Sequence, residues 1–471
     1  MQIGRLPYIL IFLLTLLSPN PLLMGLSSLS LIFVLRKFSR VYEVKMLLLV
    51  MLSYWLMVAV LLPYGAIFSI PLKDLAQATS ATEGIEMANF LGVVSLFIFG
   101  AGILLQIRKL PALSFIFLQQ LLSKYDSFRL FLAYVIYSLI LPVIQVVVLG
   151  GGGGQMLIGL IYFKWVFLSF LIVHTLIFKT NQKYVITFVL VEILLSFSGF
   201  WAEFKDYILV AVAAFMTISR KLTIRQWIYG ILAFCLTYIF FVVWTFSKGE
   251  YRRYLTGGER SQVIIQNDAI ENLSTLWTII QKDFSSEKFN ENFKTGSTGL
   301  LYRISYIEYF ARAITVVPNF IPYEDGKLLK DAFLHVLQPR ILFPNKAAIY
   351  DSEITSKYTG TQFASKDEGV SFSFGMVPER YVDFGPVYMF VPILFFGMWI
   401  GFMYRKMLED GYNRIWGMCF TAPIFNFAIS YGLPTTKFLG WSITYFFTFL
   451  ILNKYVIRRL DQWLLKKEYR S

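Results

Sequence analysis

Residues 89–107 read NFLGVVSLFIFGAGILLQI, and Arg108-Lys109 follow at once. The stretch holds no charged residue and has nearly the roughly 20 residues that a helix needs to cross the hydrocarbon core of a bilayer. Similar runs recur along the 471 residues, which are 57% hydrophobic and only 15% charged. Soluble domains carry about 25% charged residues. The sequence therefore predicts an all-α, polytopic helical membrane protein.

Twelve segments are apolar enough to be expected as membrane spans. They are 6–18, 22–35, 46–68, 89–107, 130–149, 157–178, 185–199, 206–218, 227–247, 388–404, 415–433 and 441–457. The first two are short and are separated by Ser18-Pro19-Asn20-Pro21, a combination typical of a turn. A single kinked helix over 6–35 is the alternative, and it would reverse the orientation of that end only.

Lysine and arginine gather in alternate loops. The net charge is +14, and the cations cluster within 36–45, 108–129, 179–183, 220–225, 405–414 and the residues after 457. Cytoplasmic loops of membrane proteins carry an excess of Lys and Arg. Twelve spans place every cluster and both termini on the cytoplasmic side. Because the clusters are short and lie between apolar runs, the charge indicates topology and not nucleic-acid binding.

This alternation divides the chain into four parts. They are an N-terminal membrane region of nine spans (1–247), a large external loop (248–387), a C-terminal membrane region of three spans (388–457) and a basic cytoplasmic tail (458–471). Ordered loops longer than about 15 residues are usually functional. Apolar residues recur at helical spacing within 269–281, 300–314 and 327–338. We therefore expect the loop to form a helical subdomain.

Asp331 and His335 stand four residues apart on the third of these expected loop helices. This spacing puts the carboxylate one turn before the imidazole on the same face. A carboxylate in that place can hold one tautomer of the histidine and favour its protonation, as a general base requires. A solvated surface pair is the alternative.

Several cations of the expected external side could bind an anion. Arg340 lies between Pro339 and Pro344, with Lys346 just beyond. The prolines stiffen the backbone, and the arginine fork suits bidentate phosphate contact. Arg303 borders the apolar stripe of the second loop helix, and Lys205 lies in a short external turn. A plain loop arginine and a charged hairpin cap are the alternatives.

Three ionisable residues fall inside expected spans: Lys164, His174 and Glu192. Such residues are costly in a membrane and are functional candidates by default. Glu192 needs a partner, and Lys164 is the candidate. A purely structural ion pair is the alternative to a functional one.

Motifs for cofactors and metals are absent. No glycine-rich nucleotide motif follows a strand, and the two cysteines, Cys235 and Cys419, both fall in apolar runs. Asp351-Ser352-Glu353 is the one acidic triplet of the kind used by metal-dependent glycosyl transfer, and alone it is a weak signal. We expect no cofactor and no metal.

Four stretches resemble the oligosaccharide repeat-unit polymerases, the Wzy-type polymerases of O-antigen, enterobacterial common antigen and exopolysaccharide. The first is Glu379-Arg380-Tyr381-Val382-Asp383-Phe384-Gly385-Pro386, which runs into the tenth expected span; the others are Pro339-Arg340 through Pro344, Tyr302-Arg303, and Glu203-Phe204-Lys205. In the last, many relatives have Gly-Ser/Thr-Arg, so Lys205 departs from the pattern. The resemblance covers roughly 185–405.

This resemblance implies a membrane glycosyltransferase of the GT-C type in the bacterial inner membrane. It would join undecaprenyl-diphosphate-linked donor and acceptor units on the periplasmic face, among membrane lipids and with a chain-length regulator as a further partner. Arg303, Arg340 and Lys205 would stabilise the diphosphate charge, with Arg380 as a further candidate. The base would be His335 helped by Asp331, with Glu379 or Asp383 as rivals. Tyr302 would stack on a sugar.

Three other functions remain open. An O-antigen ligase shares the architecture and transfers glycan to a lipid A core, and a histidine in the loop is compatible with it. A flippase or transporter would show inverted repeats and midplane charges. A structural protein of an envelope complex would use the loop as a docking surface.

Overall fold

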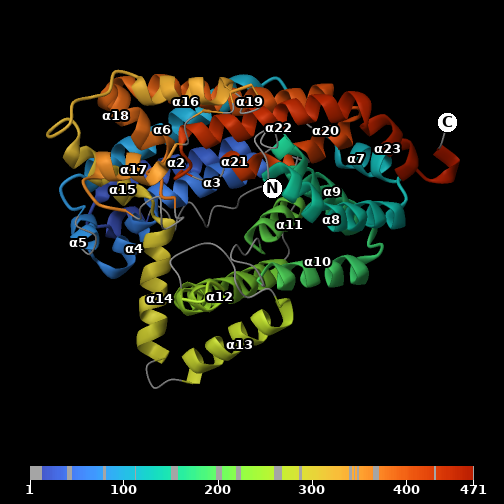
Figure 1. Cartoon of the computed structure of the whole chain (residues 1–471), viewed down its shortest axis with the longest axis horizontal. Helices are drawn as coiled ribbons and strands as arrows, with labels where there is room; N and C mark the ends of the chain where they lie inside the picture. The colour runs from blue at the N-terminus through green and yellow to red at the C-terminus, as the bar shows by residue number, and fades with distance from the viewer. Residues whose placement is uncertain are drawn as a thin grey trace.

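The computed structural model describes residues 13–39, 45–77, 81–111, 113–149, 157–197, 204–218, 224–258, 268–285, 289–338, 342–343, 345–346, 349–363, 371–428 and 431–469. Regular structure in these residues is helical, with no strand among them (Figure 1). One isolated backbone bridge joins Tyr125 to Leu465. The predicted all-α class is confirmed.

The helices of the first half are α2 (Pro21–Phe38), α3 (Met46–Ala59), α4 (Leu61–Phe68), α5 (Leu72–Gln77), α6 (Ile85–Ile107), α7 (Phe115–Leu122), α8 (Ser127–Leu149), α9 (Ile158–Phe178), α10 (Gln182–Ser196), α11 (Phe204–Ile218) and α12 (Ile224–Leu255). Those of the second half are α13 (Ala269–Ser285), α14 (Phe289–Ile304), α15 (Ile307–Val316), α16 (Lys327–Leu337), α17 (Asp351–Thr359), α18 (Met376–Tyr388), α19 (Phe390–Asp410), α20 (Arg414–Phe420), η3 (Ala422–Ile424), α21 (Phe425–Ala428), α22 (Thr435–Tyr455), α23 (Ile457–Leu464) and η4 (Lys467–Tyr469).

Five helices in the described residues are long and apolar enough to cross a membrane: α2, α6, α8, α9 and α19. The pair α3 and α4, bent by 54° at one break, brings the number to six. These helices are compatible with a membrane protein, as the composition predicts. The twelve expected spans exceed the number that meets this criterion.

Some expected spans are short or broken. Expected spans 185–199 and 206–218 correspond to α10 and α11, which have 15 residues each. Expected span 415–433 is divided into α20, η3 and α21. Pro423 lies at this break, where it supplies no backbone N–H to continue a helix. Hydropathy alone does not register such interruptions.

The predicted turn near the N-terminus is present. Residues 18–20 separate a helical stretch at 13–17 from α2, and the hydroxyls of Thr15 and Ser28 lie 3.0 Å apart across the hairpin. Asn20 Oδ1 accepts a hydrogen bond of 2.8 Å from the backbone N–H of Leu72. The start of expected span 6–18 lies outside the described residues.

The centre of the bundle is a close contact between α6 and α19. A Cβ atom added to Gly397 would lie 2.1 Å from the carbonyl oxygen of Phe99, and one added to Gly102 would lie 2.4 Å from that of Leu394. The glycines therefore let the two backbones touch. Small residues at helix contacts are the usual way in which membrane helices pack closely, because lipid gives no hydrophobic drive for association.

Loops expected on the same side of the membrane meet at the same end of the bundle. At one end, Tyr125 Oη donates to the Asp461 carboxylate over 2.6 Å, which joins two segments expected in the cytoplasm. At the other end, Tyr302 Oη donates to the carbonyl of Leu75 over 2.9 Å, which joins two expected external segments. In Figure 1, α7 and α23 lie at the right and α4 and α5 at the left.

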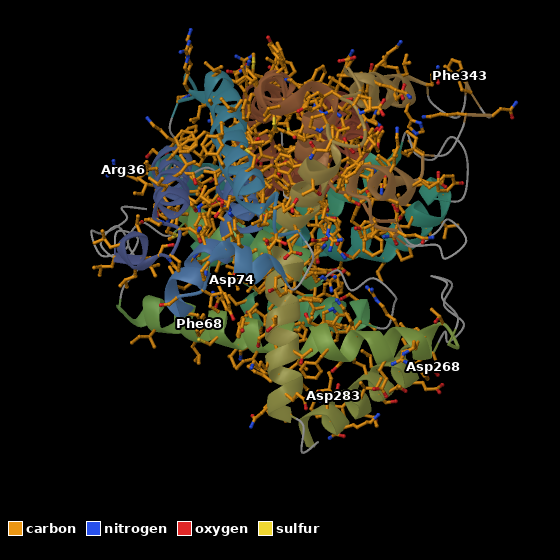
Figure 2. The ribbon with its side chains drawn as sticks, turned by 90° about the vertical axis from the view of Figure 1, so that its left-hand side faces the viewer. Arg36, Phe68, Asp74, Asp268, Asp283 and Phe343 are labelled. Carbon is orange, nitrogen blue, oxygen red and sulfur yellow. The ribbon has the colours of Figure 1, made fainter. Side chains whose placement is uncertain are left out.

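The expected external loop is divided between two hydrophobic cores. Helices α15 to α18 pack into the main core through residues such as Phe310 and Tyr381. Helices α12 and α13 form a smaller core with the ends of α10 and α11, made of Phe197, Phe204, Trp244, Tyr251, Leu255, Leu276 and Ile279. In Figure 2, Asp268 and Asp283 mark α13 on the opposite side of the molecule from Phe343.

The three helices expected in this loop appear with one correction. α13 and α16 confirm the predictions over 269–281 and 327–338. The helix expected over 300–314 is wrong, because the chain breaks between α14 and α15. The break is stabilised by tertiary contacts of Tyr306, whose N–H donates to the carbonyl of Met57 (2.9 Å) and whose hydroxyl donates to that of Ser373 (2.5 Å).

Candidate functional site

The sequence Glu379-Arg380-x-x-Asp383 on α18 forms a buried charged cluster. The Arg380 side chain has no exposed surface. Its Nη1 lies 3.2 Å from Asp383 Oδ2, and its Nη2 lies 3.4 Å from Glu379 Oε2. The i, i+3 spacing puts Arg380 and Asp383 on one helix face. Arg380 was expected as a diphosphate ligand, and the structure instead encloses it between two carboxylates.

Each carboxylate of this cluster also binds the first turn of another helix. Asp383 accepts hydrogen bonds of 2.9 Å from the N–H groups of Leu328 and Leu329, at the start of α16. Glu379 accepts one of 3.0 Å from the N–H of Thr435, at the start of α22, and another from the Thr435 hydroxyl. The first N–H groups of a helix have no partner within it and carry partial positive charge. The cluster thus fixes α16 and α22 against α18.

Burial raises the pKa of both carboxyls above the usual range, and the charge of Arg380 opposes the shift. The two buried carboxyls share one guanidinium, so when one of them is ionised its negative charge opposes ionisation of the other. A raised pKa makes the ionised carboxylate a stronger proton acceptor, as a general base requires. Glu379 also lines a cavity beside α16.

That cavity has a volume of about 280 Å³ and lies between α16, α17, α18 and the start of α22. Its lining consists of Leu328, Asp331, Ala332, Ile349, Asp351, Ile354, Glu379, Pro434 and Thr436. Among the described residues, three carboxylates and no cation line it. Among the described residues Glu379 Oε1 has no hydrogen bond, whereas Oε2 holds Thr435. One oxygen is therefore anchored and the other is available to a ligand.

Asp351 is the second buried carboxylate of the cavity. Its Oδ2 accepts hydrogen bonds from Lys437 Nζ (2.5 Å) and from Ser371 Oγ (2.8 Å). Lys437 belongs to α22, like Thr435, so the two buried carboxylates of the cavity, Asp351 and Glu379, both contact the first turn of that helix. The acidic triplet beginning at Asp351 therefore contributes to this site through its first residue. No group of three or more metal-binding side chains occurs in the described part of the chain.

An apolar groove of about 380 Å³ lies on the other side of α16. Leu329, Phe333, Pro392, Phe395, Phe396, Trp399, Leu439 and Ile443 line it, from α16, α19 and α22. Leu328 and Ala332 of α16 face the acidic cavity, and Leu329 and Phe333 face the groove. One amphipathic helix thus separates a polar cavity from an apolar groove. The first turn of this helix is fixed by its hydrogen bonds to Asp383.

The predicted pair Asp331 and His335 lies on α16, one turn apart. Asp331 lines the acidic cavity. The backbone carbonyls of His335 and Gln338 accept hydrogen bonds from Lys346 Nζ, the latter over 2.9 Å, so Lys346 binds the last turn of the helix. Lys346 also lines a pocket of about 360 Å³ with Gln338, Leu342, Phe343 and Asn345. Arg340 and both flanking prolines lie outside the described residues.

The other predicted cations lie on separate helices. Arg303 is exposed in the last turn of α14. The hydroxyl of its neighbour Tyr302 donates a hydrogen bond to the carbonyl of Leu75. Lys205 is exposed in the first turn of α11. Neither lines the acidic cavity, the apolar groove or the Lys346 pocket. The prediction that these cations share one cavity with Arg340 stays a prediction.

The predicted pairing of Lys164 with Glu192 is confirmed. Lys164 Nζ lies 2.8 Å from Glu192 Oε1 and 2.6 Å from the Tyr207 hydroxyl. Tyr134 Oη donates to the second oxygen of Glu192. Four helices, α8 to α11, contribute one residue each. The sequence predicted this pair because an unpaired charge among apolar residues is energetically costly.

Sequence reasoning missed Thr435 and Lys437. Both lie in the first turn of α22, just after Pro434, and belong to no recognisable motif. They contact Glu379 and Asp351 because the fold brings the start of α22 beside α17 and α18. A contact between residues 56 or 86 positions apart in the chain leaves no local pattern.

The chain belongs to a family described as a domain of unknown function (DUF8712), whose model matches residues 41–459. No curated protein and no solved structure matches the chain. The family match covers every helix from α3 to the first residues of α23. It therefore includes the buried charged cluster, the acidic cavity and the apolar groove.

Proposed function

We propose that the protein is a membrane glycosyltransferase that polymerises undecaprenyl-diphosphate-linked oligosaccharides on the periplasmic face of the bacterial inner membrane. The observation that carries the proposal is that α16 separates an apolar groove from an acidic cavity. A lipid-linked oligosaccharide has an apolar chain and a polar head, and here an apolar groove and a carboxylate-lined cavity lie on two faces of one helix.

The resemblance of residues 185–405 to repeat-unit polymerases supports the same substrate class. In Figure 1, α7 and α23, which belong to two of the expected cytoplasmic segments, lie at the right, and α17 and α18, which border the cavity, lie at the left; this separation supports the proposal further. With the basic end in the cytoplasm, the cavity would open on the periplasmic side, where lipid-linked units are presented.

In the proposed reaction, a hydroxyl oxygen of the acceptor sugar bonds to the anomeric carbon of the donor glycan. The bond between that carbon and the lipid diphosphate breaks, and its electron pair leaves with the diphosphate. The hydroxyl proton passes to a base, for which we propose Glu379: it lines the cavity, its Oε1 accepts no hydrogen bond from a described residue, and burial raises its pKa. His335 assisted by Asp331 is the alternative base.

No cation among the described residues lines the cavity, so we propose that the diphosphate lies outside it. Arg303, Arg340 and Lys205 remain the proposed ligands for the leaving group, because fixed positive charge lowers the energy of the developing anion. The negative lining instead suits sugar hydroxyls, which donate hydrogen bonds to carboxylates. Asp331 and Asp351 are proposed to orient the acceptor sugar in this way.

The test uses the full chain reconstituted in liposomes with lipid-linked oligosaccharide extracted from cells that lack the protein. The wild type should produce a ladder of longer glycans. Glu379→Gln keeps the size and one acceptor oxygen, so it should fold yet lose 10²-fold or more of the rate, as removal of a general base does. The matched control is Glu353→Gln, an exposed carboxylate of α17.

One result would overturn the assignment of the base, and two would overturn the proposed function. A folded Glu379→Gln protein with an unchanged ladder removes Glu379 as the base. A product joined to lipid A core identifies a ligase instead of a polymerase. Movement of the lipid-linked unit across the bilayer without a new glycosidic bond identifies a flippase.

A further inference from the structure

The C-terminal helix α23 is docked on the bundle and is not a free tail. Ile457, Asp461 and Leu464 are buried, and their i, i+4, i+7 spacing forms one face toward the protein. The Asp461 carboxylate accepts three hydrogen bonds, from the Tyr125 hydroxyl (2.6 Å), the Trp416 indole (2.7 Å) and the Asn413 amide (3.2 Å). A buried carboxylate with three hydrogen bonds at Oδ1 fixes the orientation of the helix.

Backbone bonds continue this attachment beyond the helix. The N–H of Asp126 donates to the carbonyl of Leu464, and the N–H of Lys466 donates to that of Lys124, each over 2.9 Å. Arg129 Nη1 also donates to the carbonyl of Leu465 over 3.1 Å. The turn between α7 and α8 and the end of the chain therefore form one surface (Figure 1, right).

Cations without a carboxylate partner cover this surface. The exposed basic residues are Lys124, Arg458, Arg459, Lys466 and Lys467, which we call the C-terminal basic surface. None of them forms an ion pair with a described residue. The nearby acids are otherwise engaged, since Asp461 is buried and Asp126 accepts hydrogen bonds from the N–H groups of Phe128 (2.9 Å) and Arg129 (3.1 Å). Only Glu468 remains exposed beside them.

Large apolar side chains are exposed on the helices that flank the turn between α7 and α8. Ile116 and Phe117 of α7 and Phe128 of α8 are 63%, 46% and 62% exposed, and Trp463 of α23 is 38% exposed. α8 starts here and is one of the helices able to cross a membrane. Exposed aromatic residues beside the end of such a helix are typical of the level of the lipid headgroups.

We propose that the C-terminal basic surface binds the headgroup of an anionic phospholipid, with the acyl chains against Ile116, Phe117 and Phe128. Charge complementarity selects the phosphate, and the adjoining apolar side chains select a lipid over a soluble anion. Because Asp461 and the backbone bonds fix the backbone that carries these cations before binding, only their side chains need to be ordered in the complex. The inference does not depend on the proposed glycosyltransferase function.

The test measures lipid retained by the purified full chain in native mass spectrometry, after titration with cardiolipin or with phosphatidylcholine. The triple variant Lys124→Gln/Lys466→Gln/Lys467→Gln should lose cardiolipin affinity by tenfold or more, since each surface cation is worth roughly fivefold. The matched control removes three exposed lysines elsewhere, Lys282→Gln/Lys294→Gln/Lys330→Gln, with the same change in net charge. It should retain cardiolipin as the wild type does.

A second variant separates lipid from free phosphate. Phe117→Asn/Phe128→Asn should weaken cardiolipin retention while leaving the response of the melting temperature to inorganic phosphate unchanged. Equal losses in the triple variant and its control would show that only bulk charge matters and would overturn the proposal. So would equal retention of cardiolipin and phosphatidylcholine by the wild type, or displacement of cardiolipin by millimolar phosphate.

Discussion

Arg380 and Asp383 form an ion pair of 3.2 Å in which neither side chain is exposed. Desolvation of two charges is costly, and their attraction repays it only where further hydrogen bonds satisfy the remaining groups. Here the Asp383 oxygens accept hydrogen bonds from two N–H groups of α16, whereas Arg380 Nε and Nη1 have no hydrogen-bond partner among the described residues. The pair therefore acts as a joint between α18 and α16.

The first prediction concerns this joint. Arg380→Met should lower the free energy of unfolding by about 3–5 kcal/mol, because it leaves Glu379 and Asp383 buried without a cation. Lys330→Met, at an exposed position of α16, should change it by less than about 0.5 kcal/mol. Denaturant unfolding in detergent measures both. Equal stability of the two variants would show that the cluster contributes nothing to the fold.

The second prediction is a pH dependence that Glu379 controls. Burial raises its pKa in the folded chain, so between the unfolded and folded pKa values the native state binds more protons. Stability from this group is thus complete below the unfolded value, about 4.3, and is lost as pH rises through the folded value. The activity should change in the opposite sense and rise over the same range, as the base ionises.

Thermal unfolding of the wild type and of Glu379→Gln between pH 4 and 8 tests the second prediction. The variant should show a smaller fall in melting temperature with rising pH, because its side chain does not titrate. Parallel curves for the two proteins would contradict the assignment. Glu353→Gln, whose carboxyl is exposed, should follow the wild type.

Sequence reasoning succeeded where a pattern is local. The apolar periodicity of 269–281 and 327–338 gave α13 and α16, because one face of each helix packs on the protein and the other does not. The partner of Glu192 was found on energetic grounds, since an unpaired carboxylate among apolar residues is too costly to leave. Turn residues likewise located the break at residues 18–20.

Reasoning from sequence failed where tertiary contacts decide. Nothing local ends α14 at Ile304; the break is held by the bond of Tyr306 to Met57, far earlier in the chain. The residues of the candidate site were partly identified, since Glu379, Asp383 and Asp331 were singled out. Glu379 and Asp383 bind the first N–H groups of α22 and α16. This role depends on the tertiary fold, which brings the starts of those helices to α18.

The third prediction tests the contact between α6 and α19. Gly397→Ala should destabilise the protein by roughly 1–3 kcal/mol, because its new methyl group meets the backbone of Phe99, which cannot rotate away. Gly249→Ala in α12 has open space around it and should stabilise slightly, by about 0.5–1 kcal/mol. The two melting temperatures should therefore move in opposite directions. A shift of the same sign would contradict the close packing.

The fourth prediction concerns the ion pair of Lys164 and Glu192. Lys164→Met alone should cost about 3–5 kcal/mol, since it strands the Glu192 carboxylate beside the Tyr134 hydroxyl. The double variant Lys164→Met/Glu192→Leu removes both charges and should recover much of that loss. Unfolding of the wild type, both single variants and the double variant forms a complete thermodynamic cycle. Additive losses would show that the two side chains do not interact.

The fifth prediction separates the apolar groove from lipid-facing surface in general. Phe395 and Phe447 are both 59% exposed, but only Phe395 lines the groove. Phe395→Asn should raise KM for an undecaprenyl-linked donor several-fold, because a polar amide replaces part of the wall against which the chain would lie. For a donor with a short, water-soluble chain, KM should stay unchanged, since such a chain does not reach the groove. Phe447→Asn introduces the same polar group on α22 outside the groove, so both donors should behave as with the wild type. If Phe447→Asn raised KM as much as Phe395→Asn, general disturbance of the membrane surface would explain the effect and the groove would have no role in binding.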